Sequence, residues 1–315
     1  MARALGITLV VFGHAERGLM SAGILSGPLW HQIDFAIYTF HMPLFFFLSG
    51  MGVRASQAKS GFFARRAKGI VVPYVVFSLL QGGVQIVMAG QTNGELAPRD
   101  LLLIPIQPIS PFWFLYVLLI YVALVSVFKP GWPLMAVAMV MTALSPLAEG
   151  VSFWPLFHVS FWPLFQVLYF FSFYMAGVMF GAPRLPWPIG LAALAVWAVT
   201  CFAALSNGLG FDDYYALLML PAAIGGSIAL IWIAQRLEFL GWVSWIGRNV
   251  IAIYVMHILA VAGTRIILMG FGIYDEAAHL VLGTSAGIAL PLAALLVLQR
   301  LKLAVPVGLP GSAHG

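Results

Sequence analysis

The sequence predicts an all-α integral membrane protein that crosses the bilayer about ten times, with both termini on the cytoplasmic side. Of its 315 residues, 62% are hydrophobic and only 8% are charged, and the mean hydropathy is +1.01. A soluble domain is only about half apolar and about a quarter charged. Apolar runs long enough to span a bilayer recur along the chain, and the charges between them are sorted by side.

Each predicted span is a run of about 20 mainly apolar residues between proline, glycine or charge clusters. The runs lie near residues 4–22, 34–53, 70–90, 112–128, 133–149, 165–182, 187–206, 214–234, 247–270 and 279–300. The fourth and fifth runs are short and flanked by proline. Residues 1–303 are therefore expected to form one transmembrane domain, and residues 304–315 a short C-terminal tail.

The basic residues support this count. With the N-terminus placed inside, twelve of the fifteen Lys and Arg residues fall on the cytoplasmic side, as the positive-inside rule requires. Only Arg17, Arg99 and Arg265 fall outside. Of the ten acidic residues, only Glu238 falls inside. Topology therefore explains the pI near 9.5, and no nucleic-acid partner is expected.

Thiol and metal chemistry have little support. The single cysteine, Cys201, lies inside an apolar run, which excludes a disulfide framework and a zinc site built on thiolates. A small buried hydrophobic side chain is favoured over a nucleophile. The sequence contains no Walker loop, dinucleotide fingerprint or H-E-x-x-H pattern. We expect no bound metal and no permanently bound cofactor.

The first run carries ionisable residues that are costly inside a membrane. Arg3 and His14 are eleven positions apart, so in a helix they share one face and lie about 16 Å apart along the axis. This face could hold acyl-coenzyme A, with Arg3 near the phosphates and a neutral His14 as general base. Alternatively, His14 is hydrogen-bonded as interhelical packing and Arg3 is a positive-inside anchor. Arg17 shares the face of His14 and is equally consistent with an interface anchor.

Two other groups of residues could contribute to the same chemistry. His41, in the second run, lies at a depth similar to that of His14; it could bind an acceptor, relay a proton or be structural. Arg65, Arg66 and Lys68 precede the third run and suit either phosphate groups or anionic lipid.

Two features near the outer side and the C-terminal end have simpler interpretations. Arg248 and His257 are half a turn out of phase if residues 247–270 form one helix, so His257 is interpreted as packing or cavity lining rather than as a second base. The repeated SFWPLF at 152–157 and 160–165 is interpreted as an interfacial aromatic segment. A stacking platform for sugars is the alternative.

These residues together form a recognisable pattern. Arg3 and His14 make an Arg-x10-His motif, followed by FHMPLFFFLSG at 40–50, RRAKGIVVPY at 65–74, PFWFL at 111–115 and GRNVIAIYVMH at 247–257. In this order the motifs resemble acyltransferase family three, the integral-membrane O-acyltransferases of bacteria. The resemblance spans most of the chain. Lys68 stands where the family often has the second arginine of an Arg-x-x-Arg motif.

The resemblance implies a membrane O-acyltransferase in the bacterial inner membrane. It would move an acyl group, usually acetyl, from cytoplasmic acyl-CoA as co-substrate to a hydroxyl of a cell-envelope glycan or other sugar, thereby modifying a polysaccharide. The expected partners are membrane lipid, acyl-CoA and a carbohydrate acceptor. The alternatives are a ten-span small-molecule transporter and an inactive relative that serves as a membrane subunit.

The predicted site follows from these motifs. His14 would be the catalytic base. Acyl-CoA would bind at Arg3, Arg65, Arg66 and Lys68. We expect the acceptor where His14, His41 and Trp113 converge.

Overall fold

The computed structural model describes residues 1–89, 96–148, 163–181, 183–210 and 213–312. Within these residues the chain is helical and contains no strand, which confirms the all-α class. The elements are α1 (Ala2–Ser21), α2 (Pro28–Tyr38), α3 (His41–Gly50), α4 (Val53–Gln57), α5 (Phe62–Val87), η1 (Pro98–Leu103), α6 (Trp113–Val127), α7 (Trp132–Leu144), η2 (Ser145–Ala148), α8 (Pro163–Phe180), α9 (Trp187–Ser206), η3 (Asp213–Tyr215), η4 (Leu217–Met219), α10 (Leu220–Arg236), α11 (Gly241–Arg248), α12 (Val250–Gly270) and α13 (Glu276–Arg300). Most of the repeated SFWPLF segment lies outside the described residues.

The chain forms two compact units. The first comprises Met1–Met42, Gly83–Leu96 and Arg184–Gly315, and the second comprises Pro43–Gly82 and Ala97–Pro183. The first unit therefore holds α1, α2 and α9 to α13. The second holds α4, α6 to α8 and most of α3 and α5.

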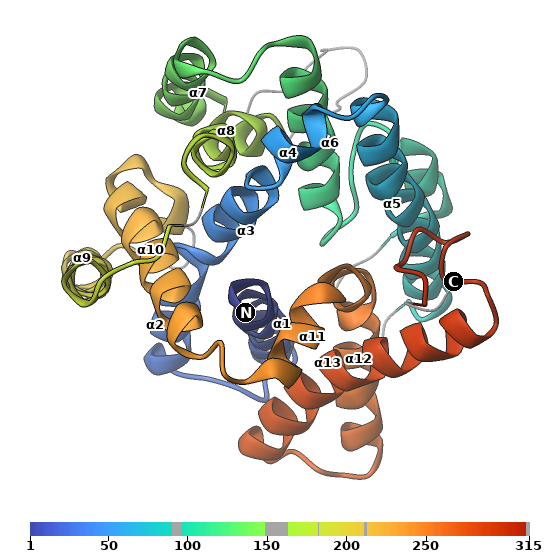
Figure 1. The fold of residues 1–315 in the computed structure, drawn as a ribbon. Helices are drawn as coiled ribbons and strands as arrows, with labels where there is room; N and C mark the ends of the chain where they lie inside the picture. The colour runs from blue at the N-terminus through green and yellow to red at the C-terminus, as the bar shows by residue number, and fades with distance from the viewer. Residues whose placement is uncertain (90–95, 149–162, 182, 211–212, 313–315) are drawn as a thin grey trace. The chain divides into compact units, whose positions relative to one another are not determined.

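Helix α1 is the centre of the first unit. It packs against α2, α10, α11, α12 and α13 (Figure 1). Helix α13 approaches it closely because Gly287 faces Val11, where an added Cβ would lie 2.5 Å from Val11 Cγ1. Small residues at such contacts let membrane helices pack closely. Close packing stabilises helix pairs in lipid, where the hydrophobic effect does not drive helices together. The polar residues of α1 therefore meet side chains from several helices.

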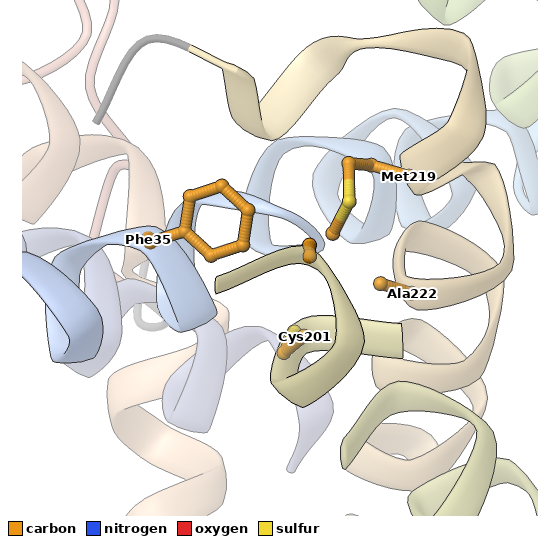
Figure 2. Close-up of a cluster of buried hydrophobic side chains, with 5 residues drawn as sticks. Phe35, Cys201, Met219 and Ala222 are labelled. Atoms are coloured by element: carbon orange, nitrogen blue, oxygen red, sulfur yellow. The ribbon is translucent and has the colours of Figure 1, made fainter. Parts of the chain in front are cut away.

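Cys201 packs in a small apolar cluster of the same unit. Figure 2 shows Phe35 of α2, Met219 of η4 and Ala222 of α10 around it, and these three side chains are 0% exposed. Cys201 itself is 6% exposed, and its Sγ lies 4.0 Å from Thr39 Oγ1. This packing agrees with the interpretation of Cys201 as a small buried side chain.

In the second unit, α8 packs against α6 and α7 and crosses α3 at two glycines. A Cβ at Gly50 would clash with the backbone carbonyl of Tyr174, and a Cβ at Gly177 would clash with that of Phe47. The two backbones are therefore in direct contact. The hydroxyl of Tyr121 on α6 also donates to the carbonyl oxygen of Val167 on α8 at 2.8 Å.

Among the described residues, seven helical stretches are long and apolar enough to cross a membrane. They are Pro28–Gln57, Phe62–Val87, Pro163–Phe180, Trp187–Ser206, Leu217–Arg236, Val250–Gly270 and Glu276–Arg300. The predicted spans at 112–128 and 133–149 coincide with two shorter apolar stretches, Trp113–Val127 and Trp132–Ala148. The first predicted span coincides with α1, whose charged residues lower its hydropathy. The fold is that of a multi-pass membrane protein; the count of ten spans and the side of each terminus stay predictions.

Candidate functional site

Arg3 and His14 lie on one unbroken helix, as the spacing requires. Helix α1 runs from Ala2 to Ser21, so both residues are on the same face. At its N-terminal end the exposed Arg3 lies beside Gly247 of α11, where a Cβ would come within 3.8 Å of Arg3 Cβ. Near the other end, the ring of His14 lies 5.1 Å from that of His257 on α12, between centroids. This face of α1 therefore contacts α11 near Arg3 and α12 near His14.

The two histidines of this pair differ in accessibility and in hydrogen bonding. His257 is 0% exposed, whereas His14 keeps part of its surface accessible. Nδ1 of His257 lies 2.7 Å from the carbonyl oxygen of Tyr254 and 3.1 Å from that of Ile253. Nε2 has no hydrogen-bond partner among the residues that the structure describes.

One turn further along α1, Arg17 forms a buried ion pair. Its Nε and Nη2 donate to the two carboxylate oxygens of Asp34 on α2, at 2.6 Å and 2.8 Å. Its guanidinium also lies 3.3 Å from the ring centroid of Tyr38. A bidentate pair stacked on an aromatic ring is a defined geometry with little freedom. Arg17 thus binds the neighbouring helix α2, and its interpretation as an interface anchor stays a prediction.

A second carboxylate lies next to this pair. Glu16 is 0% exposed, and neither of its carboxylate oxygens has a hydrogen-bond partner within the described part of the chain. It is close enough to Arg17 and Asp34 to interact with both electrostatically. The position of Glu16 two residues after His14 places it on a different face of the helix.

His41 joins the same polar region through Tyr38. It is 3% exposed, its Nδ1 lies 3.0 Å from the carbonyl oxygen of Ile37, and its ring meets that of Tyr38 edge-on at 4.4 Å. His41 also lies within electrostatic range of His14. His14 and His41 therefore lie in the same region of the first unit, and the role of His41 stays a prediction. We call His14, Glu16, Arg17, Asp34, Tyr38, His41 and His257 the polar cluster.

The remaining predicted site residues belong to the second unit. Trp113, at the start of α6, is partly buried and stacks on Phe170 with ring centroids 5.6 Å apart. It lies in an aromatic cluster with Phe46. Since the two units are described separately, its convergence with His14 and His41 stays a prediction.

Three basic residues, which the sequence placed before the third run, lie within the first two turns of α5 and differ in their contacts. Arg66 Nη2 donates to the carbonyl oxygen of Gly52 at 3.2 Å and to Ser56 Oγ at 3.1 Å. Arg65 donates to the carbonyl oxygens of Lys59 and Ser60. Arg65 therefore binds the loop that precedes α5, whereas Arg66 binds α4 and the residue before it. Lys68 is exposed.

Comparison with known protein families identifies the class of protein to which the chain belongs. The model of acyltransferase family three, described as an acyltransferase domain, matches residues 1–297. The chain belongs to acyltransferase family three. Neither the curated proteins nor the solved structures include a match.

As a family three acyltransferase, the chain is a membrane-embedded enzyme. The match covers all the motifs on which the resemblance rested, and it does not favour the transporter alternative. No group of three or more His, Cys, Asp or Glu side chains that could hold a metal ion is found in the described part of this acyltransferase.

The sequence did not lead us to Asp34 or Tyr38 of this acyltransferase's polar cluster, and it gave His257 as packing or cavity lining without its contact to His14. The half-turn offset of His257 assumed one helix over residues 247–270, but α11 ends at Arg248 and α12 begins at Val250. Asn249 before an apolar run was the available signal, because asparagine commonly starts helices. For Asp34, the available signal was its position as a lone acid in a largely apolar stretch, which suggests a buried partner.

Proposed function

We propose that this acyltransferase moves an acyl group, most simply acetyl, from cytoplasmic acyl-CoA to a hydroxyl of a cell-envelope glycan or another sugar. The observation that carries the proposal is the arrangement on α1. A partly accessible His14 lies within a buried polar cluster, and an exposed Arg3 lies on the same face at the N-terminal end of the helix. The family supplies the reaction class.

His14 acts as the general base in this proposal. Its ring nitrogen takes the proton of the acceptor hydroxyl as that oxygen attacks the thioester carbonyl carbon. The tetrahedral intermediate then collapses, the carbon–sulfur bond breaks, and the proton passes from His14 to the departing sulfur. The products are the O-acylated sugar and free coenzyme A, and His14 returns to its neutral form.

The donor extends along α1 from Arg3 to His14. Arg3 contacts the phosphates, and the spacing of about 16 Å along the helix suits the arm that joins the phosphates to the thioester. Lys68 is exposed and suits the same anion as a point charge. Arg65 holds the loop before α5 and Arg66 holds α4, and both support the donor chiefly by shaping this part of the chain.

The acceptor approaches from the outer side of a bacterial inner membrane. His41 and Trp113 belong to the acceptor side of the site in this proposal. Sugars present hydroxyls together with apolar faces; an imidazole can hydrogen-bond the hydroxyls, and an indole can pack against the apolar faces.

The test measures acyl transfer by purified protein in lipid. Labelled acetyl-CoA is supplied with an extract of envelope glycans, and wild type is compared with His14→Ala and with His31→Ala, which removes an exposed histidine outside the polar cluster. Loss of a general base lowers the rate about 10²- to 10⁴-fold. We expect this loss in His14→Ala only, with an unchanged elution profile in size-exclusion chromatography.

The outcomes separate the parts of the proposal. Label that reaches glycan with wild type and His31→Ala, but not with His14→Ala, supports donor, acceptor and base together. Equal transfer by His14→Ala would exclude His14 as the base. If acetyl-CoA is bound but not consumed, the acyl chain or the acceptor assigned here is wrong.

A further inference from the structure

The contact between His14 and His257 suggests a role for the second histidine. Their ring centroids are 5.1 Å apart, although the two residues are separated by most of the sequence. His257 is completely buried. It reaches His14 from α12, which begins at Val250 after α11 ends at Arg248.

The hydrogen bonds of His257 determine which of its nitrogens carries the proton. A backbone carbonyl oxygen only accepts, so Nδ1, which lies 2.7 Å from that of Tyr254 and 3.1 Å from that of Ile253, must be the N–H donor. A neutral imidazole carries one such proton, so Nε2 holds a lone pair and can accept. This nitrogen has no hydrogen-bond partner among the described residues.

A buried acceptor without a partner is energetically unfavourable. Leaving it unsatisfied costs about 1–3 kcal/mol, and an apolar side chain of similar size would avoid that cost. If His257 only filled space between α12 and α1, an apolar residue would serve better. The lone pair on Nε2 therefore indicates that this nitrogen accepts a hydrogen bond at some stage of the catalytic reaction.

We propose that His257 is a positioning residue for His14, an inference that rests on the proposed function. In the reacting complex, a ring N–H of His14 donates to Nε2 of His257. Rings at this separation can bring one nitrogen of each to the roughly 3 Å of a hydrogen bond by a modest rotation. Catalytic hydrogen bonds are often loose before substrate binds and tighten in the complex.

The hydrogen bond fixes the tautomer of His14. With one nitrogen protonated and directed at His257, the other nitrogen must carry the lone pair that takes the proton from the acceptor hydroxyl. No proton passes to His257, because its Nδ1 stays protonated and bonded to its own helix. His14 becomes doubly protonated when it accepts the proton from the hydroxyl, and it then loses the same proton to the leaving sulfur.

Two substitutions at one position test the role. His257→Gln keeps an acceptor, since Gln Oε1 can take the place of Nε2, whereas His257→Leu removes it at similar volume. We expect His257→Leu to lower kcat about 10- to 100-fold, the usual effect of losing the partner that orients a functional histidine. KM for acyl-CoA should change less than about twofold, and His257→Gln should recover most of kcat. Equal losses in both variants, or a wild-type kcat in His257→Leu, would overturn the inference.

A spectroscopic measurement makes the test independent of activity. Nitrogen-15 NMR of labelled histidines reports the tautomer of each ring, and the His14 signals are assigned by their absence in His14→Ala. We expect one tautomer of His14 in wild type and in His257→Gln, and a mixture in His257→Leu. An unchanged His14 tautomer in His257→Leu would refute the hydrogen bond. If instead His14→Ala keeps full activity, the proposed function fails while this measurement still decides whether the two rings are bonded.

Discussion

Arg17 shows how a charged residue can lie inside a membrane protein. A lone cation in a membrane-spanning helix is costly, but Asp34 supplies the opposite charge through two hydrogen bonds. The side chain of Asp34 is 0% exposed and that of Arg17 is 25% exposed. The attraction between buried charges only offsets their desolvation. Removing one partner therefore leaves an uncompensated charge and destabilises the protein.

The dependence of each buried charge on its partner gives a testable prediction. Asp34→Ala should destabilise the protein by about 3 kcal/mol or more, because it leaves a guanidinium buried without its counter-charge. The double variant Arg17→Met/Asp34→Ala should recover part of the loss, since it removes the unpaired charge as well. Thermal unfolding in detergent, followed by the fraction of monodisperse protein, measures both effects.

The control is a pair of charges elsewhere in the chain. Arg99 and Asp100 form an exposed ion pair at 3.9 Å, and Arg99→Ala should change the stability by less than about 1 kcal/mol. If Asp34→Ala unfolds at the same temperature as Arg99→Ala, the ion pair of Arg17 and Asp34 does not stabilise the folded protein.

Lys68 allows a test of donor binding that leaves the fold intact. It is exposed, whereas Arg66 binds Gly52 and Ser56 and cannot be replaced without loosening its contact with α4. Lys68→Ala should raise KM for acyl-CoA several-fold at unchanged kcat, because it removes charge attraction common to bound donor and transition state.

Steady-state kinetics at low and high salt measures this effect. The difference between Lys68→Ala and wild type should shrink as salt screens the charges. Lys129→Ala, which removes another exposed cation from the second unit, is the matched control and should leave KM unchanged. An equal rise of KM in both variants would indicate a general effect of surface charge and would remove Lys68 from the donor site.

At the scale of elements, the packing of α3 on α8 depends on two glycines. The backbones touch at Gly50 and Gly177, where an added Cβ would clash with a carbonyl oxygen of the other helix. A carbonyl cannot move aside as the end of a flexible side chain can, so the helices themselves must separate. Backbone contact of this kind is typical of helix pairs in membranes.

Gly177→Ala is therefore expected to destabilise the second unit. Inserting a methyl group into a closely packed contact usually costs about 1–3 kcal/mol, and a backbone contact should lie toward the upper end. Gly83→Ala is the control, because Gly83 is also helical but has no atom within 4 Å of an added Cβ among the described residues. Unfolding curves of the two variants in the same detergent should differ clearly, and coincident curves would contradict the close crossing.

Across the whole molecule, the charges predict which side of the membrane each loop faces. Helices must satisfy their own backbone polar groups in lipid, so the chain crosses as helices, and basic loops stay on the cytoplasmic side. Ten crossings with both termini inside accommodate nearly all the basic residues. The seven long apolar stretches, the two shorter ones and α1 together provide the helices for that count.

Chemical labelling of single cysteines tests this topology. Because Cys201 is the single cysteine of the chain, Cys201→Ala gives a background without thiols. In intact bacterial cells, a membrane-impermeant maleimide should label Arg99→Cys and Asp275→Cys but not Lys59→Cys. Permeabilised cells should label all three, which controls for access. Labelling of Lys59→Cys in intact cells would contradict the ten-span count with the N-terminus inside.

The sequence by itself determined the membrane class, the all-helical fold and the shared face of Arg3 and His14. All of these follow from local properties, namely the length and polarity of each run and the helical period. Only the tertiary structure decided that His257 meets His14, that Arg17 pairs with Asp34, and that Glu16 lies buried beside them. The helical period relates residues on one helix but contains no information about which helix faces another. The partners of a buried polar group come from other helices, so they are known only when those helices are packed.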